Sequence, residues 1–250
     1  WHYEMDSIDD DLSINGVVYN EMKGAFSSPD DVVEREIMNS LYPDITYGME
    51  SGGDPDVIPE LTYEEFLDFH RKYYHPSNSY VYLYGNMDAA EYLTFMDENY
   101  FSAFDELKID SKVGHQKAFA MPRELVKEYP VMEEEPVSEN TYLAYNVSMG
   151  SSLDAELYIA MEVLDYVLCS APGAPVKQAL LDKGIGKDVY STLENGIFQP
   201  YFSIVAKNAD EAQKEEFEKT INQVLTELVE KGINKKSLEA AINHYEFQYR

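Results

Sequence analysis

The sequence has a single cysteine, Cys169, among its 250 residues. An intrachain disulfide and a metal cluster built from several thiolates are therefore excluded, and we expect a reducing, cytoplasmic location. Basic residues are also scarce, with 19 Lys and Arg against 47 Asp and Glu, which gives a net charge of −28. Because such a chain repels a polyphosphate backbone, nucleic acid is not an expected partner. The acidic surface serves solubility, and its field would attract basic peptides or metal cations.

Long apolar runs are missing as well. The richest run, from Tyr158 to Cys169, is interrupted by Glu162 and Asp165 and is too short to cross a bilayer, so we expect no membrane span. The first residues, Trp1 to Glu4, have neither the basic start nor the apolar centre of a signal peptide. Aromatic residues, by contrast, are plentiful at 13% of the chain, which supplies enough apolar surface for a folded core.

The common catalytic motifs are absent from the sequence. It contains no G-x-S-x-G, no Walker loop, and neither H-E-x-x-H nor H-x-x-E-H. Among the histidines only His70 and His75 lie near each other, and their spacing does not place both on one helix face. His75 precedes Pro76 at the predicted end of a helix, where a structural cap is expected rather than a metal ligand.

Apolar periodicity and capping residues predict a chain of mixed helices and strands. The predicted helices cover 14–25, 30–41, 62–75, 88–104, 154–169, 175–184, 210–232 and 235–250. The predicted strands cover 80–84, 128–131, 142–147, 187–193 and 201–206. Strand pairs separated by helix pairs indicate a layered α+β fold. The polar, aperiodic stretch 105–118 predicts a boundary between a first domain, 1–108, and a second domain, 109–250.

One segment carries a specific family resemblance. Gly16 to Ala25 reads G-V-V-Y-N-E-M-K-G-A, and it resembles the G-V-V-[FY]-N-E-M-K-G segment of zinc metallopeptidases of the pitrilysin/insulinase type, presequence-protease subfamily. Other signatures of this subfamily are matched in the same order by Ser51-Gly52-Gly53-Asp54-Pro55, Ile58-Pro59, Leu61-Thr62 and Tyr74-His75-Pro76-Ser77-Asn78. The second half is similar in layout only, chiefly at 175–186. The resemblance implies layered units of the mitochondrial-processing-peptidase type, with the first unit truncated and the second nearly whole.

The resemblance also implies one zinc ligand in this chain. In that family, two histidines of an upstream H-x-x-E-H helix and a glutamate of a later helix hold the zinc, and Glu21 of Asn20-Glu21-Met22 matches this glutamate. By its spacing from Val17 and Val18, Glu21 lies at the edge of an apolar stripe, where a carboxylate is costly unless it is paired or metal-bound. The alternative is that Glu21 points outward or meets a lysine. No catalytic residue is assigned here.

The last predicted helix receives no stop signal, and the chain starts abruptly at Trp1, so we expect an internal fragment of a longer parent protein. The resemblance implies that the parent is an endopeptidase that degrades unfolded peptides in an enclosed chamber. Without H-x-x-E-H, the isolated chain is expected to bind no zinc and to be inactive. The alternatives are a non-catalytic structural or assembly homologue of the same fold, and an unrelated acidic binding module. Dimerisation through apolar faces left uncovered in a fragment is a further expectation.

Overall fold

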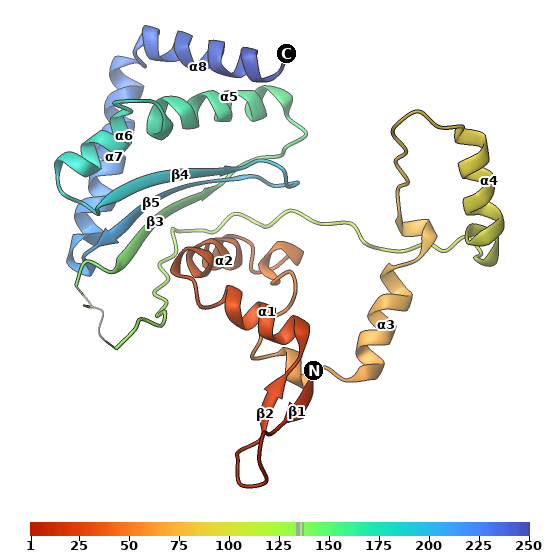
Figure 1. The fold of residues 1–250 in the computed structure, drawn as a ribbon. Helices are drawn as coiled ribbons and strands as arrows, with labels where there is room; N and C mark the ends of the chain where they lie inside the picture. The colour runs from red at the N-terminus through yellow and green to blue at the C-terminus, as the bar shows by residue number, and fades with distance from the viewer. Residues whose placement is uncertain (134–135, 137) are drawn as a thin grey trace. The chain divides into compact units, whose positions relative to one another are not determined.

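A three-stranded antiparallel sheet forms the centre of the C-terminal half of the chain, with its strands in the order β3–β5–β4 (Figure 1). The computed structural model describes residues 1–133, 136 and 138–250. The strands are β3, Thr141–Ser148, β4, Asp188–Glu194, and β5, Tyr201–Ala209. In register, Ile204 of the central strand pairs with Tyr145 on one side and with Ser191 on the other. Residues of β5 therefore alternate between two covered faces, which accounts for the nearly continuous burial of this strand.

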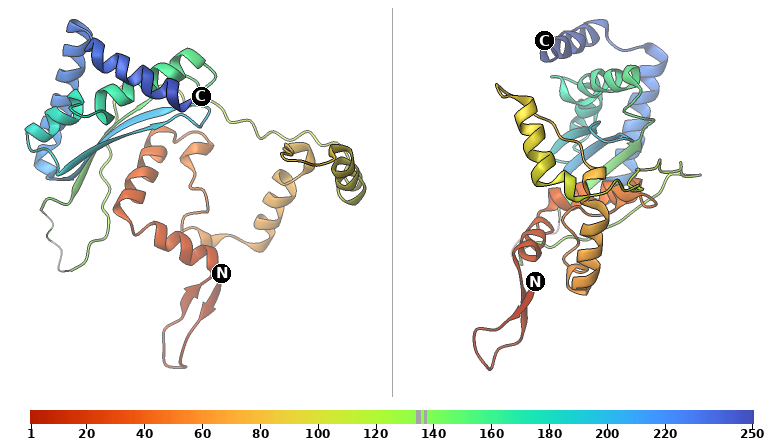
Figure 2. Two further views of the ribbon diagram at one scale, coloured as in Figure 1. Left: turned by 45° about the horizontal axis from the view of Figure 1, so that its top comes forward. Right: turned by 90° about the vertical axis from the view of Figure 1, so that its right-hand side faces the viewer.

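One face of the sheet is covered by helices (Figures 1 and 2). These are α5, Ala155–Asp165, which continues as a π-helical turn, Tyr166–Ser170, then α6, Pro175–Asp182, and α7, Lys214–Lys231. The last helix, α8, Lys235–Gln248, packs against α5 and the π-helical turn on the side away from the sheet (Figure 1). A 3-10 turn, Glu211–Gln213, precedes α7. Phe202, Ile204 and Ala206 point from β5 into the core that these helices complete. Because Gly232 adopts a positive φ of 82°, α7 ends there as the sequence predicts.

The opposite face of the sheet packs against α2, Pro29–Leu41. Ser28 caps this helix, and Pro29 stands at its first position, where its missing N–H costs nothing. Ile37 of α2 and Tyr42 form a second buried cluster with Tyr201 and Val205, the β5 residues that alternate with Ile204. A short 3-10 turn, Thr46–Gly48, follows. The sheet is therefore the middle layer, with α2 on one face and the layer that contains α5, α6 and α7 on the other.

The π-helical turn holds the single cysteine. Ala171 N donates to Tyr166 O at 2.7 Å, which closes the wide turn, and Cys169 is only 2% exposed. Burial raises the pKa of the Cys169 thiol to about 12. By length and composition alone, the segment Ala155–Asp182 is apolar enough to cross a membrane. A core helix meets the same criterion, and several residues of this segment lie in the core beside the sheet, namely Leu168, Cys169, Val176 and Leu180.

The N-terminal part of the chain is built from shorter elements. A hairpin of β1, His2–Glu4, and β2, Ser13–Asn15, leads into α1, Val17–Ala25. After the 3-10 turn Ile58–Glu60 come α3, Tyr63–Tyr73, the turn Pro76–Asn78, α4, Ala89–Asn99, and the turn Phe101–Ala103. Two compact units result: 1–22 with 52–114, and 23–51 with 115–250. The two-domain boundary expected within 105–118 stays a prediction.

The fold class is confirmed as α+β, and most predicted elements are present. The strand predicted over 80–84 is wrong, because these residues form no ladder with any described strand and Tyr80, Tyr82 and Tyr84 are exposed. The strand predicted over 128–131 is also absent. The predicted helix 14–25 begins only at Val17, since Ser13–Asn15 pair with the first strand instead. β-forming side chains make a strand only where a partner strand completes its hydrogen bonds.

Candidate functional site

Helix α1 carries the predicted metal ligand, and the hairpin before it fixes where the helix begins. His2 pairs with Asn15, which leaves Gly16 directly against the N-terminal strand. A Cβ atom at Gly16 would lie 2.9 Å from Trp1 Cα, so only glycine allows this approach. The close approach of Trp1 therefore explains why the G-V-V segment begins with glycine.

Glu21 lies in the middle of α1 and is exposed. Among the described residues, no hydrogen bond or ion pair engages its carboxylate. Val17 and Val18, the apolar neighbours on which the expected cost of burying Glu21 depended, are 86% and 54% exposed. The burial argument therefore does not hold within this chain, and Glu21 presents an open carboxylate on an exposed helix face. Its role as a zinc ligand stays a prediction.

The residue after Glu21 anchors the helix. Met22 is 9% exposed, and a Cβ atom at Gly52 would lie 2.5 Å from Met22 Sδ. Gly52 and Gly53 have φ angles of 94° and 95°, a backbone conformation that favours glycine. The Ser51-Gly52-Gly53-Asp54-Pro55 signature thus forms a tight connection whose surface receives Met22. Two separate signatures meet here, and together they hold the part of α1 that carries Glu21.

His70 and His75, the two histidines that are near each other in sequence, make local structural contacts. Ser77 N donates to His75 Nδ1 at 3.1 Å, so His75 caps the turn Pro76–Asn78, as its position before proline predicts. His70 stacks on Tyr74 with ring centroids 4.7 Å apart. Within the described ranges, no three or more His, Cys, Asp or Glu side chains are grouped so that they could hold a metal ion. The described residues therefore contain no complete metal site, and a zinc ligand at Glu21 stays a prediction.

The titratable groups with the largest pKa shifts belong to the second compact unit, whereas Glu21 belongs to the first. Burial raises the pKa of Asp165, although Ser191 Oγ donates to its carboxylate at 2.5 Å. The neighbouring Cys169 is held in the thiol form by the raised pKa described above. A nucleophilic cysteine needs a lowered pKa and access to substrate. Asp165 and Cys169 therefore do not form an activated nucleophile.

Comparison with known proteins identifies a family for this chain. Residues 60–245 match the family model described as "Peptidase M16 inactive domain". Over 250 residues, which is 100% of this chain, the sequence is 46% identical to "Protein HypA" of Clostridium perfringens, covering 26% of that protein. It is 37% identical to "Presequence protease 1, chloroplastic/mitochondrial" of Arabidopsis thaliana, covering 100% of this chain and 23% of that protein. The chain thus spans about a quarter of the length of these curated relatives.

Solved structures share the fold at low sequence identity. The crystal structure of a peptidase M16 inactive domain from Pseudomonas fluorescens superposes with a TM-score of 0.64 at 19% identity, covering 93% of this chain and 55% of that chain. A protease from Helicobacter pylori gives a TM-score of 0.63 at 17% identity, covering 93% and 55%. The family model begins at residue 60, after the α1 signature. The segment with Glu21 is included in the whole-chain matches to the curated relatives.

Proposed function

Because the chain belongs to the peptidase M16 family, we propose that it is part of a zinc-dependent endopeptidase that degrades unfolded peptides. One observation carries the proposal: the whole chain is 37% identical to a presequence protease. The relatives are about four times longer than the matched segment, so the activity belongs to a longer parent protein. The isolated chain is expected to be inactive.

In this proposal α1 contributes Glu21 as a ligand of the zinc ion. A carboxylate ligand must be free of competing partners, and the exposed Glu21 meets this requirement among the described residues. When bound, the zinc would act as a Lewis acid toward a peptide carbonyl or water. The further ligands and the general base would come from outside this chain. The contribution of the chain itself is to fix Glu21 through the seating of Met22 on Gly52.

The proposal is tested on the parent protein with Glu21→Gln, which keeps the size of the side chain and removes its charge. Zinc content by elemental analysis and cleavage of an unstructured peptide are the readouts. Loss of a direct ligand should weaken zinc binding by about 100-fold or more, beyond the effect of losing an outer-shell partner. The matched control is Glu64→Gln on α3, an exposed carboxylate of the same compact unit, which should retain both zinc and activity. Full zinc occupancy in Glu21→Gln would exclude Glu21 as a ligand.

A non-catalytic structural homologue is the second candidate. The matched family model, which covers residues 60–245, is itself described as an inactive domain, and this observation favours the alternative for that segment. The wild-type parent distinguishes the two. Stoichiometric zinc with peptide cleavage supports the peptidase, whereas absence of both would support a structural or assembly subunit.

A further inference from the structure

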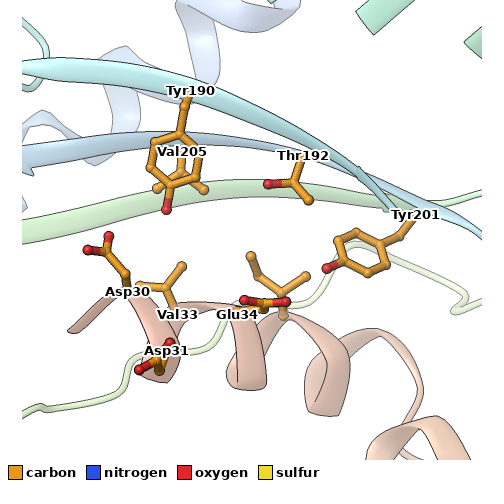
Figure 3. A pocket seen from close by; sticks show the side chains of 9 residues that line it. Asp30, Asp31, Val33, Glu34, Tyr190, Thr192, Tyr201 and Val205 are labelled. Atoms are coloured by element: carbon orange, nitrogen blue, oxygen red, sulfur yellow. The ribbon is translucent and has the colours of Figure 1, made fainter. Parts of the chain in front are cut away.

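A cavity of about 320 Å³ lies between α2 and the sheet within the second compact unit (Figure 3). Its walls are apolar where Val33, Ile37 and Val205 face it, and aromatic where Tyr190 and Tyr201 do. This size lies at the lower end of the range for pockets that bind small ligands or single side chains. The sequence alone did not predict a cavity at these residues.

Carboxylates of α2 line the rim of the cavity. Asp30 Oδ2 accepts from Lys207 Nζ at 2.6 Å, so this position already holds one ammonium group. Asp31 lies in the first helical turn, where its charge offsets the positive end of the helix dipole. Glu34 lies one turn further along the helix, and no described cation pairs with it. Glu34 therefore offers an exposed carboxylate at the rim that is open to a cationic group.

The hydroxyl of Tyr201 is a second, independent observation. Tyr201 is 2% exposed, and its hydroxyl points into the cavity (Figure 3). None of the described residues forms a hydrogen bond with this oxygen, and since no fully buried side-chain oxygen or nitrogen among them lacks a partner, the oxygen itself is accessible from the cavity. The hydroxyl is therefore free to accept a hydrogen bond from a group that enters the cavity. Burial, and then the charge of Glu34, raise the pKa of Tyr201 to about 12, so the negative field of the rim reaches this hydroxyl.

We propose that this cavity binds the guanidinium group of an arginine side chain in a peptide. A guanidinium is planar and weakly hydrated, which suits the apolar walls, and it carries several N–H donors. Glu34 and the Tyr201 hydroxyl would accept from these donors, while the ring of Tyr190 offers a face for a cation–π contact. The affinity for the group does not depend on Glu21, which belongs to the other compact unit. That the arginine is part of a peptide rests on the proposed function.

The test uses the chain itself with Ile and Val methyl groups labelled for NMR. Nα-acetyl-arginine amide is titrated at low salt, with the citrulline analogue as a neutral probe of the same shape and the lysine analogue as an ammonium probe. We expect the arginine probe to shift the methyl signals of Val33, Ile37 and Val205, and the citrulline analogue to leave them unchanged. Because the rim carboxylates are exposed, added salt should weaken the binding. A lysine analogue that binds as tightly as arginine would overturn the assignment to guanidinium.

Variants separate the pocket from the general charge of the chain. Glu34→Gln should weaken binding about three- to tenfold, and Tyr201→Phe, which removes only the hydroxyl, about threefold. Glu218→Gln removes an exposed carboxylate of α7 and should leave the affinity within about twofold. The methyl spectrum reports whether each variant is folded, and Asp31→Asn replaces any variant that is not. Equal weakening by Glu34→Gln and Glu218→Gln, or methyl shifts outside the cavity only, would overturn the proposal.

Discussion

Replacing Tyr42 by phenylalanine should destabilise the second compact unit, because the hydroxyl of the buried Tyr42 forms hydrogen bonds inside it. Tyr42 is 0% exposed. Its hydroxyl donates to Gln199 O at 2.7 Å and to Pro200 O at 3.1 Å. Pro200 O keeps a second donor, Met149 N at 2.8 Å, whereas Gln199 O has no other donor among the described residues. Tyr42→Phe thus leaves the Gln199 carbonyl oxygen without a hydrogen bond, and it also removes the side-chain hydrogen bond between Ser148 and Tyr42.

The expected loss of stability follows mainly from the Gln199 carbonyl oxygen, which loses its hydrogen bond. The phenylalanine ring fills the same space, so no large cavity is added, and the cost is that of an unsatisfied buried polar group, about 2 kcal/mol in the free energy of unfolding. For a unit of this size, the loss corresponds to a fall in Tm of roughly 4–8 °C. Urea unfolding followed by far-UV circular dichroism measures the change in free energy, and a thermal scan measures the change in Tm.

The matched control is Tyr190→Phe. Tyr190 is half-buried in the same unit, and no described residue shares a hydrogen bond with its hydroxyl. Its loss should change the free energy of unfolding by less than about 0.5 kcal/mol. The reasoning would be refuted if Tyr42→Phe unfolded at the same urea concentration as the wild type, or if both variants lost equal stability.

Two further predictions concern the same unit. Gly186→Ala should lower the free energy of unfolding by about 2–4 kcal/mol, because φ is +71° and the new Cβ would lie 2.8 Å from Lys207 O. The control Gly184→Ala has a similar φ of +69° but no atom within 4 Å of the new Cβ, so it should lower the free energy by only about 1 kcal/mol. Equal urea midpoints for the two variants would contradict the close contact at Gly186. Burial, and then Glu34, raise the folded-state pKa of Tyr201 to about 12 from 10.0, so its contribution to stability is complete below pH 10 and is lost as pH rises toward 12. The loss is up to about 1.4 kcal/mol per pH unit, and urea midpoints from pH 9 to 11.5 should fall less steeply in Tyr201→Phe; an unchanged slope would contradict the shift.

Local signals in the sequence predict the elements that depend on local interactions. The capping box of Thr62 and Glu65 is present, with Glu65 N donating to Thr62 Oγ1 at 3.2 Å, and α3 begins there as predicted. The order and type of the elements from β3 to α8 follow from apolar periodicity and from the helix start at Pro175 and the helix ends at Gly184 and Gly232. These signals work because caps and turns are satisfied by residues close in the chain.

Features that depend on distant partners were not predictable in the same way. The run 80–84 has the composition of a strand, yet a strand also requires a neighbour to bond with, and no described residues supply one. The cavity beside α2 brings together carboxylates and tyrosines that are far apart in sequence. Two signals were present: Glu34 on the helix face with Asp30 and Asp31, and tyrosines at 190 and 201 on one face of adjacent strands. The strand register places the tyrosines on one face of the sheet, and only the packing of α2 on that face brings the carboxylates opposite them.

The prediction for Glu21 came from the family resemblance rather than from the geometry of the chain. The pattern of α1 suggested a carboxylate at the edge of a buried stripe, but only Met22 of that stripe is buried. Periodicity identifies which residues share a helix face, and it does not identify what covers that face. The family signature carries information about surrounding parts of a longer protein that the residues of one segment do not contain.

The burial of the single cysteine has a practical consequence for studying this chain. With Cys169 2% exposed and its thiol pKa raised to about 12, maleimide reagents at neutral pH have almost no thiolate to attack while the fold is intact. The native molecule therefore behaves toward such reagents as a cysteine-free background. A fluorophore or spin label could be attached at one introduced cysteine in each compact unit without first removing the natural one, and the distance between the two labels would report how the units are arranged in solution.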